Sequence, residues 1–214
     1  MQPIISIRRS TILSACAILF FVTAFAWQFT APETAFAAVN CGDSSWSVGT
    51  EADLNAAIVC FNAKPAGSYT ITLTADIPIG ASTTQINNAT AGAQLIVEGS
   101  GFAVDGQNGD RRPFEVMSNT DVTLQNIIIK RGRRNGQGGG ILNNGTLTLD
   151  RVLMQDNKGT RGGAIYSNGP LTITQSVIQG SEARYTGSGT GIGGAVEHNN
   201  LVGRLAAPDL DHSF

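Results

Sequence analysis

The stretch that decides the fold runs from Gly138 to Leu149 and reads GGGILNNGTLTL. It returns 24 residues later, from Gly162 to Ile173, as GGAIYSNGPLTI. Its glycine signature returns again as Gly193-Gly194-Ala195-Val196. Self-similarity at a short, nearly fixed period is typical of stacked repeat architectures, so we expect each copy to form one coil of a repeat protein.

The strand within this repeat extends toward the N-terminus. Val122-Thr123-Leu124, Leu95-Ile96-Val97 and Ile71-Thr72-Leu73 align with Leu147-Thr148-Leu149 at successive steps of 25, 27 and 24 residues. With Leu171-Thr172-Ile173, five short strands share one column. In each strand the apolar residues alternate with a residue that is usually threonine, which predicts apolar side chains facing in and threonines facing out.

A second strand is expected about three residues after the first, at residues 127–129, 152–154 and 176–178. A single coil of this kind cannot enclose a core, whereas stacked coils can. The pattern therefore predicts an all-β solenoid with parallel sheets along its length.

Asparagines recur at one turn position of successive coils, namely Asn119, Asn144, Asn168 and Asn199. Asparagine tolerates the left-handed backbone of a sharp turn, and its amide can hydrogen-bond to a stacked copy. We expect a structural role for these four residues.

The glycine signature, the N-x-G-x-L-T strand and the segment Met154-Gln155-Asp156-Asn157 resemble the GGA[ILV] and FxxN repeats of polymorphic outer-membrane proteins. They also resemble the wider group of right-handed parallel β-helix, or pectin-lyase-like, surface proteins. Met154 replaces the phenylalanine, and the next coil lacks the asparagine. The resemblance spans Ala52 to Asn200 and implies a right-handed parallel β-helix of about five to six coils. Because one β-helix can carry adhesins, lyases, hydrolases or inert stalks, the fold alone does not identify the activity.

The chain is expected to have four parts. Residues 1–37 have the basic start, apolar middle and small residues before a cleavage site that are typical of a secretory signal peptide, the alternative being an uncleaved anchor. Residues 38–66 form an N-terminal cap with a short helix, residues 67–200 form the repeats, and residues 201–214 form an irregular tail. The tail either caps the solenoid or marks a shortened copy of a longer repeat protein.

The capping helix has its own signals. Thr50 followed by Asp53 resembles a capping box, and Leu54, Ala57 and Phe61 share one helical face with Ile58. Such a helix would cover the open end of the first coil.

Cysteine usage fits export. Cys16 lies within the expected signal peptide, which leaves Cys41 and Cys60 as an even pair. In an oxidising compartment this pair predicts a disulfide, the alternative being two buried free thiols. We expect no metal and no cofactor, an extracellular or outer cell-surface location, and no transmembrane helix in the mature chain.

The overall charge argues against nucleic-acid binding. The 16 acidic and 14 basic residues give a net charge of −2, and charged residues make up only 14% of the chain. The 26 glycines indicate a turn-rich β protein, and an apolar content of 42% excludes wholesale disorder.

No catalytic residue is predicted. Glu98 and Asp150 share a column, but Gln125 separates them, and outward residues on solvated strand ends explain the two carboxylates better than a catalytic pair does. The turn cluster Asp105, Asp110, Arg111 and Arg112 resembles the acidic and basic residues of a pectate lyase site, although turn chemistry explains it more simply. His198 aligns with Asn143 and has no partner that spacing can establish.

One basic feature indicates binding. The same loop on three coils carries positive residues, namely Arg133, Arg134, Lys158, Arg161 and Arg184. Stacking would gather them into a ridge suited to acidic glycans or other cell-surface polymers, the alternative being ordinary solvated loops. We therefore expect a non-enzymatic surface protein for adhesion or glycan binding. The alternatives are a polysaccharide lyase or glycoside hydrolase, and a truncated copy without function.

Overall fold

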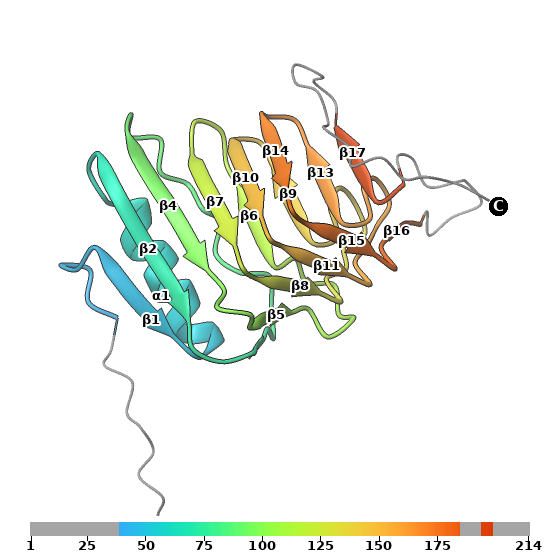
Figure 1. Ribbon diagram of the computed structural model, residues 1–214, viewed down its shortest axis with the longest axis horizontal. Coiled ribbons are helices and arrows are strands. Elements are labelled where there is room, and N and C mark those ends of the chain that lie inside the picture. Colours follow the sequence, from blue (N-terminus) through green and yellow to red (C-terminus); the bar gives the residue numbers. More distant parts are fainter. Residues whose placement is uncertain (1–38, 185–193, 199–214) are drawn as a thin grey trace, which may run out of the picture. The chain divides into compact units, whose positions relative to one another are not determined.

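The computed structural model describes residues 39–184 and 194–198, which form a solenoid of stacked parallel strands (Figure 1). Successive turns of the chain each add one strand to a sheet, and the largest sheet has six strands, so the solenoid has about six turns. The predicted all-β solenoid with a capping helix is confirmed. The expected signal peptide 1–37 and the tail 201–214 lie outside the described residues.

Three sheets run along the solenoid, and a separate two-stranded pair lies in the connection from the second sheet to the third. Sheet A contains β1 (Ser45–Val48), β2 (Gly67–Leu73), β4 (Ala93–Glu98), β7 (Asp121–Gln125), β10 (Thr146–Asp150) and β14 (Leu171–Thr174). Sheet B contains β3 (Ile77–Pro78), β5 (Ala103–Asp105), β8 (Ile128–Lys130), β11 (Leu153–Gln155) and β15 (Val177–Gln179). Sheet C contains β6 (Phe114–Val116), β9 (Ile141–Asn143), β13 (Ile165–Ser167) and β17 (Val196–His198). The pair is β12 (Lys158–Gly159) and β16 (Glu182–Ala183).

The core lies between the sheets and is made of the alternating apolar residues. In sheet A, Leu95, Leu124 and Leu149 are completely buried, whereas the residues between them are half-buried or exposed. The predicted inward and outward faces are therefore confirmed. Leu171 and Ile173 are only half-buried because β14 is the last described strand of this sheet.

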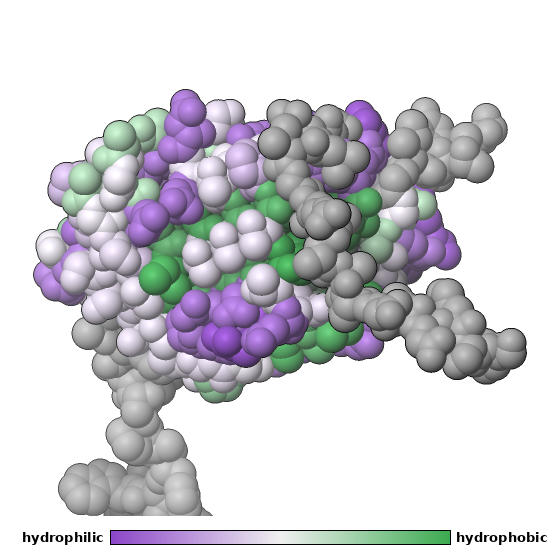
Figure 2. Space-filling model, turned by 45° about the horizontal axis from the view of Figure 1, so that its top comes forward, coloured by the Kyte–Doolittle hydropathy of each residue, from purple (hydrophilic) through white to green (hydrophobic). Residues whose placement is uncertain are grey.

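The outer face of sheet A is weakly polar. Thr123, Thr148 and Thr172 lie opposite one another on successive strands. On the face that Figure 2 draws, pale residues of intermediate hydropathy lie in the middle between strongly hydrophobic residues, and strongly hydrophilic residues gather farther out.

One predicted register is wrong by two residues. The sequence places Ile71 opposite Leu95, whereas in the structure Tyr69 pairs with Leu95 and Ile71 pairs with Val97. A shift of two keeps every side chain on its face, because the side-chain period of a strand is two, so the hydrophobic pattern does not distinguish the two registers.

The glycine signature leads into sheet C. Gly138 and Gly162 have left-handed φ angles of +60° and +58°. A Cβ at either position would lie only 2.0 Å from a backbone carbonyl oxygen, that of Ile141 or of Ile165. Only glycine fits this turn, which explains why the signature repeats.

A buried asparagine secures the turn that leaves sheet B. Met154 and Asn157 are both fully buried. The Asn157 side chain donates to the Ile129 carbonyl at 2.8 Å and accepts from the Gly132 amide at 2.9 Å, both on the preceding coil. The asparagine side chain thus provides hydrogen-bond partners for two backbone groups, and a buried backbone group without a partner would destabilise the fold.

Asn119, Asn144 and Asn168 all lie in the turn that leads from sheet C to sheet A, but Asn119 does not occupy the same place in it as the other two. Asn168 donates to Asn144 across adjacent coils at 2.7 Å. Asn119 has a left-handed backbone (φ 62°) and lies in a turn of four residues between β6 and β7, whereas Asn144 lies in a turn of two residues between β9 and β10. Asn199 lies outside the described residues.

The N-terminal end is capped as expected. The helix α1 (Glu51–Asn62) begins after Thr50, whose hydroxyl accepts from the Asp53 amide at 3.2 Å, and it buries Leu54, Ala57, Ile58 and Phe61. Cys41 and Cys60 form a disulfide, with 4.9 Å between their Cα atoms. No helix within the described residues has the length and apolar character needed to cross a lipid bilayer.

Substitution of Leu147 by lysine is expected to unfold the solenoid, whereas Thr148→Lys is tolerated. The first change buries a charge in the core and removes packing, at a cost of more than about 3 kcal/mol, while the second leaves the charge in water at a cost below about 1 kcal/mol. Thermal unfolding followed by circular dichroism measures both. Equal effects of the two changes would contradict the assignment of faces.

Removal of the disulfide in a Cys41→Ser/Cys60→Ser variant is expected to loosen the N-terminal cap. A closed loop of this length stabilises the folded state by about 3 kcal/mol in the chain-entropy model. Denaturant unfolding measures the loss, and mass analysis of the parent protein with and without reductant shows whether the bond is present. Two freely alkylated thiols in the parent protein would refute the expectation.

Candidate functional site

The connection between sheet B and sheet C carries the basic residues and stacks them. Arg133 pairs with Lys158 in a parallel bridge, and Lys158 pairs with Glu182 in β12 and β16. These three residues therefore occupy one column on three successive coils. Strands in a sheet lie about 4.8 Å apart, so neighbouring side chains in the column come close together.

The stacked connection encloses a hollow of about 400 Å³. Its lining residues are Asn108, Asp110, Arg133, Arg134, Asn135, Lys158, Gly159 and Arg184. Four of the five predicted binding residues are thus brought together. We call this feature the basic hollow.

Two carboxylates partly neutralise the basic hollow. Glu182 lies 3.1 Å from Lys158 and 2.7 Å from Arg184, and Asp110 lies 3.8 Å from Arg134. Hydrogen bonds from Arg184 and Lys158 hold the pKa of Glu182 below its ordinary value. Four cations against two carboxylates leave an excess of two positive charges.

The hollow also contains a cation without a counter-ion. Within the described part of the chain, the Arg133 guanidinium forms no ion pair, and the residue is exposed. It is therefore available to an anionic ligand from solvent.

Arg161, the fifth predicted residue, lies apart from this group. Its guanidinium pairs with Glu197 and lies over the Tyr166 ring, 4.9 Å from the ring centroid. The residue belongs to the bridge with Gln137 that leads into sheet C, so it does not line the hollow.

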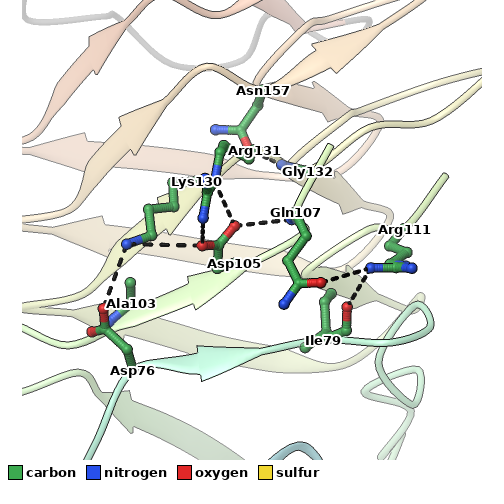
Figure 3. Close-up of polar contacts among 10 residues, drawn as sticks. All are labelled: Asp76, Ile79, Ala103, Asp105, Gln107, Arg111, Lys130, Arg131, Gly132 and Asn157. Carbon is green, nitrogen blue, oxygen red and sulfur yellow. Dashed lines mark hydrogen bonds and ion pairs between the residues drawn. The ribbon is translucent and has the colours of Figure 1, made fainter. Parts of the chain in front are cut away.

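Asp105 lies at the end of β5, just before the loop that contributes Asn108 and Asp110 to the hollow, and Figure 3 shows its polar contacts. It is 6% exposed, and its carboxylate accepts two bonds from Arg131 and one from the Gln107 amide, with Lys130 3.9 Å away. The Arg131 carbonyl in turn accepts from the Asn108 amide at 2.9 Å. This network fixes the loop that presents Asn108 and Asp110.

The same contacts set the charge of Asp105. Burial alone would raise the pKa of this carboxyl, but the hydrogen bonds from Arg131 and Gln107 and the charges of Arg131 and Lys130 outweigh it and hold the pKa below its ordinary value of 3.8. Asp105 is therefore a structural anion at neutral pH.

Arginines of the predicted turn cluster also bond within the protein. Arg111 donates to the Ile79 carbonyl and to Gln107 (Figure 3). Arg112 is buried, pairs with Glu115 at 2.5 Å and donates to the carbonyl of Gly138. These contacts tie the glycine turn of one coil to the preceding coil.

Glu98 and Asp150 lie on sheet A, with Gln125 between them as predicted. Glu98 accepts from Gln125, from Asn126 and from the Ser100 amide. Burial alone would raise the pKa of Glu98, but these bonds and the charge of Arg151 hold it below the ordinary value.

The other two groups considered for catalysis also have partners. Asp150 pairs with Arg151 at 2.8 Å and accepts from Thr174. His198 continues the column of Asn143 and Ser167, as the alignment predicts, and its ring nitrogen lies 3.1 Å from the Gly169 carbonyl.

Sequence reasoning missed Glu182 as the counter-ion of the basic residues. The signal was present, because Glu182 follows Lys158 by 24 residues, which is one repeat. Within residues 39–184 and 194–198, no three metal-ligating side chains come together. No protein-family model, curated protein or solved structure matches the chain.

The variant Asp105→Asn is expected to lower the free energy of unfolding by about 1–3 kcal/mol at pH 7, because charged hydrogen bonds are lost. Since the folded-state pKa of Asp105 is depressed, its stabilising effect is complete above the unfolded pKa of about 3.9 and is lost as the pH falls through the folded value. Urea unfolding between pH 7 and pH 3 measures this. The variant should lose less stability than the parent on acidification, and parallel curves would contradict the assigned role.

Proposed function

We propose that this chain is an exported, non-enzymatic β-solenoid of the cell surface, which binds an acidic glycan or another anionic polymer through the basic hollow. The observation that carries the proposal is the convergence of Arg133, Arg134, Lys158 and Arg184 on one hollow. This convergence contrasts with a net charge of −2 for the whole chain. A concave cluster of one sign concentrates oppositely charged ligands from solution.

The ligand class follows from the chemistry of the hollow. Three of its four cations are arginines, whose planar guanidinium groups suit carboxylate, sulfate and phosphate oxygens. The cations extend over several coils, so a polymer with repeated charges can contact more of them than a small anion can. Exposed charges are screened over about 8 Å at physiological ionic strength, so binding should be weak and sensitive to salt.

Export and surface location are supported by two features. The first 37 residues have the composition of a signal peptide, and the Cys41–Cys60 disulfide is a bond that persists in oxidising compartments. The repeat motifs resemble those of pectin-lyase-like surface proteins and of polymorphic outer-membrane proteins. We include the chain among proteins of that type as part of the proposal.

A lyase or hydrolase would need carboxylates that are available to a substrate. The non-enzymatic assignment is supported by the contacts that engage the candidate carboxylates of this chain. Glu98, Asp105 and Asp150 are each held by hydrogen bonds or ion pairs within the protein. Such contacts give Glu98 and Asp150 structural roles at the ends of strands β4 and β10, and they give Asp105 a structural role beside the loop that contributes Asn108 and Asp110 to the hollow.

Retention on an immobilised sulfated or uronic-acid polymer tests the proposal. The parent protein should elute at a defined salt concentration, and Arg133→Ser/Arg184→Ser should lower its affinity about five- to thirtyfold, since each exposed contact is worth up to about 1 kcal/mol. Arg151→Ser/Arg161→Ser loses the same charge outside the hollow and is the matched control.

The control should elute with the parent protein, and circular dichroism should show that all three proteins are folded. Identical elution of the hollow variant and the parent would reduce the basic residues to a solubility feature. Equal weakening by both double variants would mean that net charge, rather than the hollow, causes retention.

A further inference from the structure

Glu182 holds two cations of the basic hollow with one oxygen atom. Its Oε1 lies 3.1 Å from the Lys158 Nζ and 2.7 Å from the Arg184 Nε. Glu182 and Lys158 are direct partners in the register of β12 and β16. The Glu182 side chain is 38% exposed, so the carboxylate is reachable from solvent.

Lys158 and Arg184 both contact the same oxygen of Glu182. An anionic group of a ligand would be held by these two cations in the same way. We infer that Glu182 occupies the place of that group and acts as an internal competitor, so that the hollow binds polyanions of strong acids most tightly when Glu182 is uncharged. This inference rests on the proposed function of the hollow and specifies its ligand class and its regulation.

Competition with Glu182 depends on the acid strength of the ligand. A uronic-acid polymer carries the same functional group as Glu182, so both lose their charge over a similar range of acidic pH. Sulfate esters and phosphodiesters keep their charge there. Acidification therefore frees Lys158 and Arg184 for a strong-acid polymer while it neutralises a uronic-acid polymer.

The groups around Glu182 define where this change occurs. Lys158 on β12 and Arg184 after β16 face the carboxylate, and their hydrogen bonds hold its pKa below the ordinary value of 4.5. The second carboxylate of the hollow, Asp110, lies against Arg134 on the loop after β5. A rise in affinity for a strong-acid polymer that is caused by protonation of Glu182 should therefore appear below pH 4.5. The same rise should be absent from a Glu182→Gln variant.

The experiment compares three full-length proteins on immobilised dextran sulfate, poly(glycerol phosphate) and polygalacturonate between pH 7 and pH 3.5. The proteins are the parent, Glu182→Gln, and Asp121→Asn as a control that loses one negative charge at the start of β7, outside the hollow. At pH 7, Glu182→Gln should bind at least one of the two strong-acid polymers about two- to fivefold more tightly than the parent, the size of one exposed ion pair. The parent should gain more affinity than the variant as the pH falls, because only the parent has the Glu182 charge to lose, and the difference between the two proteins should shrink.

Circular dichroism identifies any protein that unfolds at low pH. If one does, the affinities of the three proteins at pH 7 decide whether the inference holds. If the parent is retained but Glu182→Gln binds no more tightly than Asp121→Asn, the inference is overturned while the basic hollow stands. A gain of Glu182→Gln on polygalacturonate alone also overturns it. If no protein is retained on any polymer, both the inference and the proposed function fail.

Discussion

The stacking of coils in register is the constraint on which the rest of this structure depends. A coil of about 25 residues has no core of its own, so Leu95, Val122 and Leu147 are buried only because they form one column on adjacent strands. Register fixes the short connection from sheet A to sheet B, with two residues between β7 and β8 and again between β10 and β11. The connection from sheet B to sheet C varies in length, and it is there that the basic residues lie.

Tight coils also bring backbone close to backbone, and a few side chains resolve the resulting conflict. Gly138 and Gly162 supply left-handed turns that a Cβ would block, and buried Asn157 pairs with the Ile129 carbonyl and the Gly132 amide of the preceding coil. The two glycines repeat because the geometry of the turn repeats, whereas Asn157 stands on one coil only. The glycine signature therefore reflects the steric and hydrogen-bond requirements of the fold. These requirements are independent of what the protein binds.

The same reasoning explains how much the sequence could predict. The period of the repeat and the two faces of its strands followed from patterns that span several coils, whereas the cap followed from local helix signals and the disulfide from the number of cysteines. The register of Tyr69 against Leu95 did not follow, because a shift of two residues leaves the pattern unchanged. The sequence pattern grouped Arg161 with the other basic residues because they lie in the same loop of the repeat. It could not show that Arg161 lies where the chain enters sheet C and pairs with Glu197. Side-chain partners across coils need the three-dimensional register, and the hollow is made of such partners.

Register also couples the stability of this fold to the binding that we propose for the basic hollow. Equivalent side chains on neighbouring coils lie about 4.8 Å apart, so a column of like charges repels itself, whereas opposite charges stabilise the pairing. Arg133, Lys158 and Glu182 form such a column, and its third member relieves the repulsion of the first two. A solenoid that stacks cations to attract a polyanion thus tends to include carboxylates for its own stability, and those carboxylates compete with the ligand. If the hollow binds a polyanion as proposed, a substitution that removes the Glu182 charge is expected to lower stability and raise affinity.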